Sequence, residues 1–125
     1  MDEPDFAAAP LSGLRAFILA KDEEANILRG ISALEGFGAR VTVLDSGSTD
    51  VTCERVAGHT RATVVSYRYV DHVTAYDDIL LRMAASGEPV AIFDADMVVS
   101  PALAQELGEL LRRDDWDAIV APVDW

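Results

Sequence analysis

Hydrophobic residues along the chain gather in short, nearly continuous runs separated by polar turns. The first run, LRAFILA, lacks alternation with polar residues and is typical of a strand buried on both faces. Three later runs have the same character, and the predicted strands span residues 14–20, 41–44, 62–67 and 90–93. A further run at 118–121 is expected to begin a fifth strand.

Between these runs, apolar residues recur at helical spacing. The segment EEANILRGISAL, residues 23–34, begins with acidic residues, which the helix dipole favours in a first turn. A short helix is expected over 50–57, with Ser48 or Thr49 as its cap. Further helices are predicted from 73 toward Gly87 and from Pro101, a residue favoured in a first turn, to about 113.

Strands that alternate with helices, without a hairpin signal, predict right-handed crossovers and an α/β fold. The expected architecture is a Rossmann-like, mostly parallel sheet with helices on both faces, apparently truncated, formed by residues 14–125 as one domain. Residues 1–13 are expected to be a loose acidic leader. In such sheets, ligands bind beyond the carboxyl ends of the strands.

Charge restricts the partners of this chain. Ten Lys and Arg residues against 22 Asp and Glu residues give a net charge of −12, which argues against nucleic acid or an anionic membrane surface as partner. The single Cys53 permits no intrachain disulfide and is expected to be a small buried side chain in a protein of a reducing compartment. No apolar run approaches the ~20 residues of a membrane-spanning helix, so we expect no part of this chain to cross a bilayer. The expected location is the cytoplasm, with the protein either free or peripheral to the membrane, in keeping with the single cysteine.

Polar residues follow three of the predicted strands, at the edge where ligands are expected. They are Lys21, Asp22 and Glu23, then Asp45, Ser46 and Gly47, then Asp94 and Asp96. Two aspartates at i and i+2, where a strand ends, can turn toward one point and share a divalent cation. Carboxylate oxygens favour Mg²⁺ or Mn²⁺. Such an ion would offset the repulsion between an acidic chain and a diphosphate.

Each of these segments also has a simpler interpretation. Asp94 and Asp96 could be solvated or helix-capping acids, and DSGSTD could be an ordinary turn with a helix cap. Residues 21–24 could be no more than an acidic helix start. His59 and His72 stand apart from other ligand residues and are expected on the surface. The polar strand ends favour a binding site because they occur together.

Three segments together resemble a known family. LRAFILAKDEEANI, VTVLDSGSTDVT and SGEPVAIFDADMVVSPAL are similar, in order and spacing, to the nucleotide-binding half of the family-two glycosyltransferases with the A-type fold. The resemblance covers residues 14–122. It implies an inverting hexosyltransferase-type enzyme that takes a nucleoside-diphosphate sugar of the UDP or GDP type, with Mn²⁺ or Mg²⁺ as cofactor; the acceptor is not identified.

The resemblance also implies roles by position. Ala20, Lys21 and Glu23 would line the nucleotide base, which Asp45 would hold through a ring nitrogen. Of the DxD pair, the first aspartate would meet the ribose or the metal, and the second would coordinate the metal on the diphosphate. The implied donor-binding residues are Ala20, Lys21, Glu23, Asp45, Ser46, Gly47, Asp94, Ala95 and Asp96, of which Asp94 and Asp96 are the metal ligands.

The chain departs from the family in two places. Asp78 and Ile79 stand where the family commonly has a basic residue followed by Asn, so repulsion replaces attraction for the diphosphate. Only 29 residues follow Asp96, whereas the family's catalytic base and acceptor segments lie well beyond the DxD pair. No residue is therefore predicted as the base. We expect a donor-binding domain that needs a further C-terminal segment or an oligomeric partner, with Trp116 and Trp125 on an exposed apolar surface.

Two other functions are open at this point. A nonenzymatic or degenerate nucleotide-binding domain is favoured by Asp78. FDADMV also resembles the nucleophile motif of haloacid-dehalogenase-like phosphatases, in which Asp94 would be the phosphorylated nucleophile and Asp96 the acid/base. That family places its motif near the N-terminus, which counts against this alternative.

Overall fold

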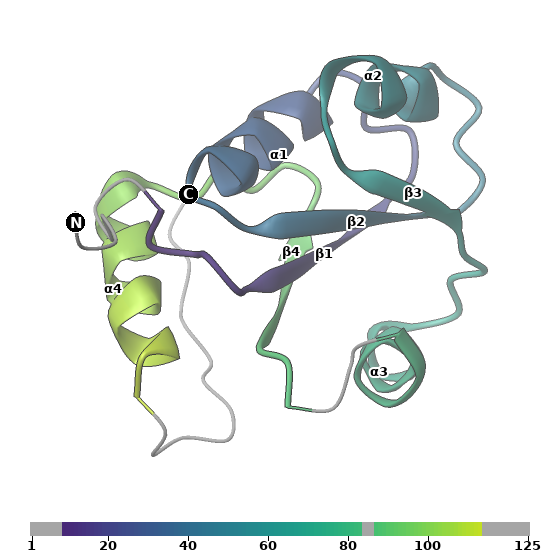
Figure 1. Ribbon diagram of the computed structural model, residues 1–125. Helices are drawn as coiled ribbons and strands as arrows, with labels where there is room; N and C mark the ends of the chain where they lie inside the picture. Colours follow the sequence, from purple (N-terminus) through teal and green to yellow (C-terminus); the bar gives the residue numbers. More distant parts are fainter. Residues whose placement is uncertain (1–8, 84–86, 114–125) are drawn as a thin grey trace.

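The computed structural model describes residues 9–83 and 87–113. Strands and helices alternate along the chain, as Figure 1 shows. The elements are β1 (Arg15–Ala20), α1 (Ile27–Gly36), β2 (Arg40–Asp45), α2 (Thr52–His59), β3 (Thr63–Ser66), α3 (His72–Asp78), the π-helix η1 (Ile79–Met83), β4 (Val90–Asp94) and α4 (Pro101–Leu111).

The four strands form one sheet, in which every neighbouring pair is parallel. Their order is β3-β2-β1-β4, so β1 lies between β2 and β4. Because all four run the same way, their carboxyl ends share one edge of the sheet. The parallel α/β fold predicted from the sequence is confirmed, whereas the fifth strand predicted at 118–121 lies outside the described residues.

Helices cover both faces of the sheet, as predicted (Figure 1). Successive side chains of a strand point to opposite faces, and β1 follows this rule. Ala16 and Ile18 pack in a cluster that includes residues of α1, α2 and α4, whereas Phe17 packs on the other face against Leu44 and Ile79. All three β1 side chains are nearly inaccessible to solvent, which explains the uninterrupted apolar run in the sequence.

The end of the expected loose leader is packed rather than loose. Leu11 is fully buried in the cluster beneath α1, and its N–H donates to the carbonyl oxygen of Phe37 at 2.8 Å. The absence of a side chain at Gly108 lets α4 approach Pro10, whose carbonyl oxygen would lie 2.6 Å from an added Cβ. Packing against two helices therefore holds residues 10 and 11 in place.

Three helix predictions need correction. The helix predicted from residue 23 begins at Ile27, so Glu23 and Glu24 precede it and do not lie in its first turn. The helix predicted from residue 50 begins at Thr52, and neither Ser48 nor Thr49 caps it. The Ser48 hydroxyl donates to Asp45 of its own loop, and the Thr49 hydroxyl donates to Asp22 of the loop after β1. The helix predicted from 73 is α-helical only to Asp78 and continues as the π-helix η1. By contrast, α4 begins at Pro101 as expected, with Ser100 as its cap accepting from the Leu103 N–H at 3.1 Å. No helix among the described residues is long and apolar enough to cross a membrane.

Gly30 of α1 lies directly against the loop that follows β4. A Cβ placed there would approach the carbonyl oxygen of Met97 more closely than carbon and oxygen atoms can. Gly36, near the end of the same helix, would place its Cβ in open space. The contact at Gly30 thus sets how closely α1 approaches the loop after β4.

Gly30→Ala is expected to lower the free energy of unfolding by about 1–3 kcal/mol, because the new methyl group must displace backbone atoms. Gly36→Ala is the matched control, and it should be neutral or stabilise by up to about 1 kcal/mol through helix propensity. Denaturant titrations monitored by circular dichroism measure both. Equal effects of the two substitutions would contradict the close approach at Gly30.

Candidate functional site

The candidate residues lie at the carboxyl edge of the sheet, on three adjacent strands. Asp45 ends β2 and is in register with Ala20 of β1, while Asp94 ends β4 and is in register with Leu19 of β1. With a spacing of roughly 4.8 Å between strands, the Asp45 and Asp94 backbones are about 10 Å apart across β1. The strand order also reverses beside β1, and such switch points are where open α/β sheets bind ligands.

Asp45 is buried and holds the loop that follows it. Its carboxylate accepts from the N–H groups of Gly47 and Ser48, at 3.2 and 3.1 Å, and from the Ser48 hydroxyl. Burial alone would raise the pKa of Asp45, but hydrogen bonds from Ser48, Cys53 and Gly47 outweigh it and hold that pKa below its ordinary value. Asp45 is therefore ionised at neutral pH and already engaged by its own loop.

Cys53 is partly exposed, not buried as the sequence suggested. Burial and the neighbouring Asp45 carboxylate raise the pKa of its thiol. A thiol that stays protonated can donate a hydrogen bond to Asp45, and it is a poor nucleophile. Cys53 thus supports the loop after β2.

Asp22 ties the loop after β1 to the loop after β2. Its carboxylate accepts from the N–H groups of Thr49 and Asp50, at 2.6 and 3.2 Å, while its own N–H donates to the Ser48 hydroxyl oxygen at 2.9 Å. The φ angle of Asp22 is 54°, in the left-handed region that Asp tolerates better than most residues. Asp22 was predicted only as part of a polar strand end, and the structure makes it the link between two loops.

A second set of hydrogen bonds joins the same two loops, between residues 23–24 and residues 50–52. The Glu23 N–H donates to the Thr52 hydroxyl at 2.9 Å, and the Glu24 N–H donates to Asp50 at 3.2 Å. Asp50 also accepts from the Thr52 N–H at 2.9 Å and from the Thr52 hydroxyl. We name the two segments 21–24 and 45–52 the paired loops. Their shape is fixed by donors that surround three aspartates.

The DAD segment after β4 exposes both of its carboxylates. The side chain of Ala95 is buried in the cluster beneath α1, whereas Asp94 and Asp96 on either side of it are exposed. The Met97 N–H donates to the Asp94 carbonyl oxygen at 3.1 Å, which turns the chain sharply after the strand. The segment is thus held by its small middle residue and by the contact of Met97 with Gly30.

Asp94 and Asp96 differ from the aspartates of the paired loops. Within the described part of the chain, neither carboxylate makes a hydrogen bond or an ion pair. Capping of α4 falls to Ser100, so the interpretation of these acids as helix caps is wrong. Two free carboxylates suit a hard divalent cation such as Mn²⁺ or Mg²⁺, which commonly takes only one or two protein ligands and completes its shell with water and phosphate oxygens. No cluster of three or more His, Cys, Asp or Glu with metal-site geometry occurs among residues 9–83 and 87–113.

Asp78 is engaged with its neighbours. It accepts the hydroxyl of Tyr67 at 2.6 Å and pairs with Arg82 at 3.4 Å. The hydrogen bond to Asp78 raises the pKa of Tyr67 to about 12, so the phenol remains protonated. Since the Tyr67 N–H also donates to the Asp45 carbonyl oxygen at 2.8 Å, Tyr67 connects the end of β2 to α3. In this chain, the residue at the family's basic position anchors a helix.

The structure brings some predicted residues together and keeps others apart. Asp22, Asp45 and Ser48 belong to one hydrogen-bonded network, as do Glu23 and Thr52. The exposed Asp94 and Asp96 lie across β1 from that network and make no bond to it. Lys21 is exposed directly after β1, and His59 and His72 are exposed elsewhere, as expected.

Replacing Asp45 with Asn should lower the free energy of unfolding by about 1–3 kcal/mol at pH 7, because charged acceptors give the stronger hydrogen bonds. The folded-state pKa of Asp45 lies below its ordinary value of 3.8, so its ionisation stabilises the fold above that value and loses this effect as pH falls through the folded pKa. The deficit of Asp45→Asn should therefore shrink in acid. Urea titrations between pH 7 and about 3 measure it, with the exposed Asp77→Asn as control. A deficit independent of pH would contradict this assignment.

Comparison with known proteins identifies similar structures. No protein-family model and no curated protein matches the chain. A crystal structure of a mycobacterial protein is 30% identical with a TM-score of 0.52, over 81% of this chain and 37% of that one. The structure of glucosyl-3-phosphoglycerate synthase from Mycobacterium tuberculosis in complex with Mn²⁺, UDP and phosphoglyceric acid is 28% identical with a TM-score of 0.49, over 74% of this chain and 36% of that one.

The chain spans just over a third of the length of each of these two proteins. The mycobacterial protein supports the α/β fold described above, because its similarity extends over most of the chain. The chain therefore has an α/β fold shared with a solved mycobacterial protein, and its sequence resembles the nucleotide-binding half of the family-two glycosyltransferases.

Proposed function

We propose that this chain is the donor-binding portion of a glycosyltransferase, which binds a nucleoside-diphosphate sugar through a divalent cation. The observation that carries the proposal is the contrast between two groups of acids at one edge of the sheet. The aspartates of the paired loops each accept two or more hydrogen bonds from within those loops, whereas Asp94 and Asp96 are exposed and unpaired among the described residues. Both carboxylates of the second group are therefore available to hold a metal ion.

Each group has a distinct task in this proposal. The paired loops and the end of β1 form the wall for the nucleoside. Ala20 ends β1, Lys21 and Glu23 lie on one loop, and Asp45, Ser46 and Gly47 lie on the other. Asp94 and Asp96 would hold Mn²⁺ or Mg²⁺ beside the diphosphate. The Asp94 backbone is about 10 Å from that of Asp45, across β1. When bound, the metal ion supplies Lewis-acid stabilisation to the departing nucleoside diphosphate.

The backbone fixes these groups before a ligand arrives. Burial of Ala95 and the contact between Gly30 and Met97 orient the DAD segment, so its two carboxylates do not have to be gathered from a flexible loop. Ser46 donates its N–H to the Ala20 carbonyl oxygen at 2.9 Å, which joins the two sides of the nucleoside wall. In this proposal, the residues that bind the acceptor and remove its proton come from a longer protein or from a partner subunit. A reducing, cytoplasmic location fits the single cysteine.

Isothermal titration calorimetry tests the proposal, with UDP and Mn²⁺ as the first probes because the similar synthase was crystallised with both. UDP should bind in the presence of Mn²⁺ and lose at least about tenfold in affinity with EDTA or in Asp96→Asn, since one charged interaction contributes roughly 1.5–3 kcal/mol. GDP, tested in the same way, determines the base preference. Glu106→Gln on α4 removes the same charge away from the site and should leave binding unchanged.

Other outcomes separate the competing functions. Metal-independent UDP binding that survives Asp96→Asn would contradict the metal role and favour a degenerate nucleotide-binding domain. Release of phosphate from p-nitrophenyl phosphate, lost in Asp94→Asn, would replace the proposal with a phosphatase. Absence of binding to both UDP and GDP with either metal would overturn the donor-binding role itself.

A further inference from the structure

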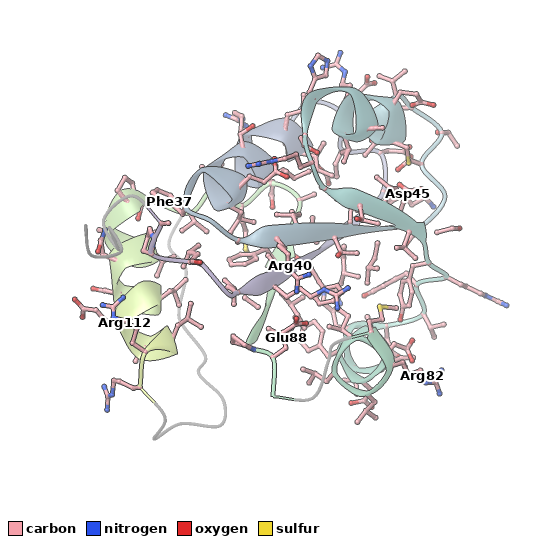
Figure 2. The ribbon with its side chains drawn as sticks, viewed as in Figure 1. Phe37, Arg40, Asp45, Arg82, Glu88 and Arg112 are labelled. Atoms are coloured by element: carbon pink, nitrogen blue, oxygen red, sulfur yellow. The ribbon has the colours of Figure 1, made fainter. Side chains whose placement is uncertain are left out.

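A cavity of about 380 Å³ opens at the amino edge of the sheet, opposite the proposed donor site. Its lining includes the first residues of three neighbouring strands: Arg15 of β1, Arg40 of β2 and Thr63 of β3. Figure 2 shows Arg40 beside Glu88, with Asp45 at the other end of β2. The cavity therefore cannot be part of the site built on Asp45 and the DAD segment.

Basic side chains are concentrated around this cavity. Arg15, Arg40 and Arg61 line it, and they are three of only ten Lys and Arg residues in a chain with a net charge of −12. Two carboxylates, Glu35 and Glu88, lie among them. Positive groups thus outnumber negative ones by one, which makes this an attractive place for an anion on an acidic protein.

Arg15 is held in place by its surroundings, whereas the exposed Arg40 is positioned by one ion pair. Arg15 is three-quarters buried, donates to the Met83 carbonyl oxygen at 2.7 Å, and places its guanidinium carbon 4.8 Å from the centre of the Phe17 ring. Glu88 pairs with both Arg15 and Arg40, at 3.4 and 2.7 Å. This shared carboxylate keeps the two guanidinium groups together, so little conformational freedom is lost when an anion binds.

The third arginine is available to a ligand. Arg61 is exposed, and its guanidinium makes no ion pair with any side chain of the described chain. Its backbone N–H donates to a Glu35 carboxylate oxygen at 2.9 Å, which fixes the rim of the cavity where Arg61 begins. The Arg61 side chain can therefore close over a ligand without first breaking a bond of its own.

The carboxyl-terminal ends of α1 and α2 also lie near this cavity, because Glu35 and Arg61 adjoin those ends. Their partial negative charges attract arginines and weaken the field that an anion experiences. An alternative role for the arginines is to stabilise these helix ends, but that role would not require a cavity between them. The two roles can be distinguished, because loss of a helix-end contact would change the stability of the protein and not its ligand binding.

We infer that this cavity binds the phosphate group of a small phosphorylated molecule. Guanidinium groups match phosphate oxygens in pairs, and a volume of 380 Å³ is in the range of small-molecule sites. Thr42 and Thr63 supply additional hydroxyl groups to the lining. The strongly acidic net charge argues against a polyanion such as nucleic acid as the ligand. The site is independent of the donor site because it uses other residues at the opposite edge.

Titration of ¹⁵N-labelled protein with inorganic phosphate, followed by NMR, tests this inference. EDTA is present throughout so that no metal ion can recruit phosphate to the DAD segment, and chloride holds the ionic strength constant. Saturable shifts are expected for the amides of Arg40, Thr42, Arg61 and Thr63. Arg61→Gln should weaken binding about tenfold, as the loss of one charged hydrogen bond does. Arg29→Gln removes a charge from the exposed face of α1, outside the cavity, and should change the affinity less than twofold.

A glycerol phosphate titration then tests whether the rest of the cavity contributes, and it should give tighter binding than inorganic phosphate at the same amides. Equal weakening by Arg61→Gln and Arg29→Gln would show a general charge effect and overturn the inference. Shifts confined to residues 45–48 or 94–97, or no saturable shifts, would overturn it as well. If the unmodified protein does not bind phosphate and Arg61→Gln lowers its thermal stability, the arginines stabilise the helix ends and the inference is overturned.

Discussion

Parallel pairing of β1 with β2 on one side and with β4 on the other determines where every candidate site residue lies. The register places Ala20 beside Asp45 and Leu19 beside Asp94, so three loops leave the sheet at one edge within two strand spacings. This pairing requires β1 to be apolar on both faces, and Ala16, Phe17 and Ile18 meet that requirement. A polar residue at any of these positions would weaken the central strand and separate the two halves of the proposed donor site.

The acidic residues at that edge fall into two groups, which differ in whether their carboxylates accept hydrogen bonds from the chain. Asp22, Asp45 and Asp50 are surrounded by N–H and O–H donors, and hydrogen bonds lower the pKa of Asp45 and Asp50 despite the opposing effect of desolvation. These acids stabilise the loops without any cation. Asp94 and Asp96 receive no such donors within the described chain, so their mutual repulsion is relieved only by solvent or by a bound cation. Acids at one edge of the sheet therefore differ in how many hydrogen bonds they accept.

Much of this arrangement could be predicted from the sequence. Strands buried on both faces produce apolar runs, and the residues after such runs must lie at one edge of a parallel sheet. Side-chain roles could be predicted less well, because Asp22, Asp50 and Thr52 act through partners in another loop. The start of α2 at Thr52 accompanies a hydrogen bond from the Glu23 N–H to the Thr52 hydroxyl, which local propensity does not reveal, and no local pattern predicted the π-helix η1. The amino-edge cavity has no sequence signature, since Arg15, Arg40 and Arg61 are far apart in the chain.

We expect the DAD segment, and not the paired loops, to hold the divalent cation. Paramagnetic broadening of backbone amide signals by Mn²⁺, in the presence of UDP, locates the ion directly. Broadening is expected to be strongest at Ala95, Asp96 and Met97, weaker at Asp45 about 10 Å away, and weakest at Arg40 at the amino end of β2. Broadening centred on residues 45–50, or spread evenly over the acidic surface, would contradict it.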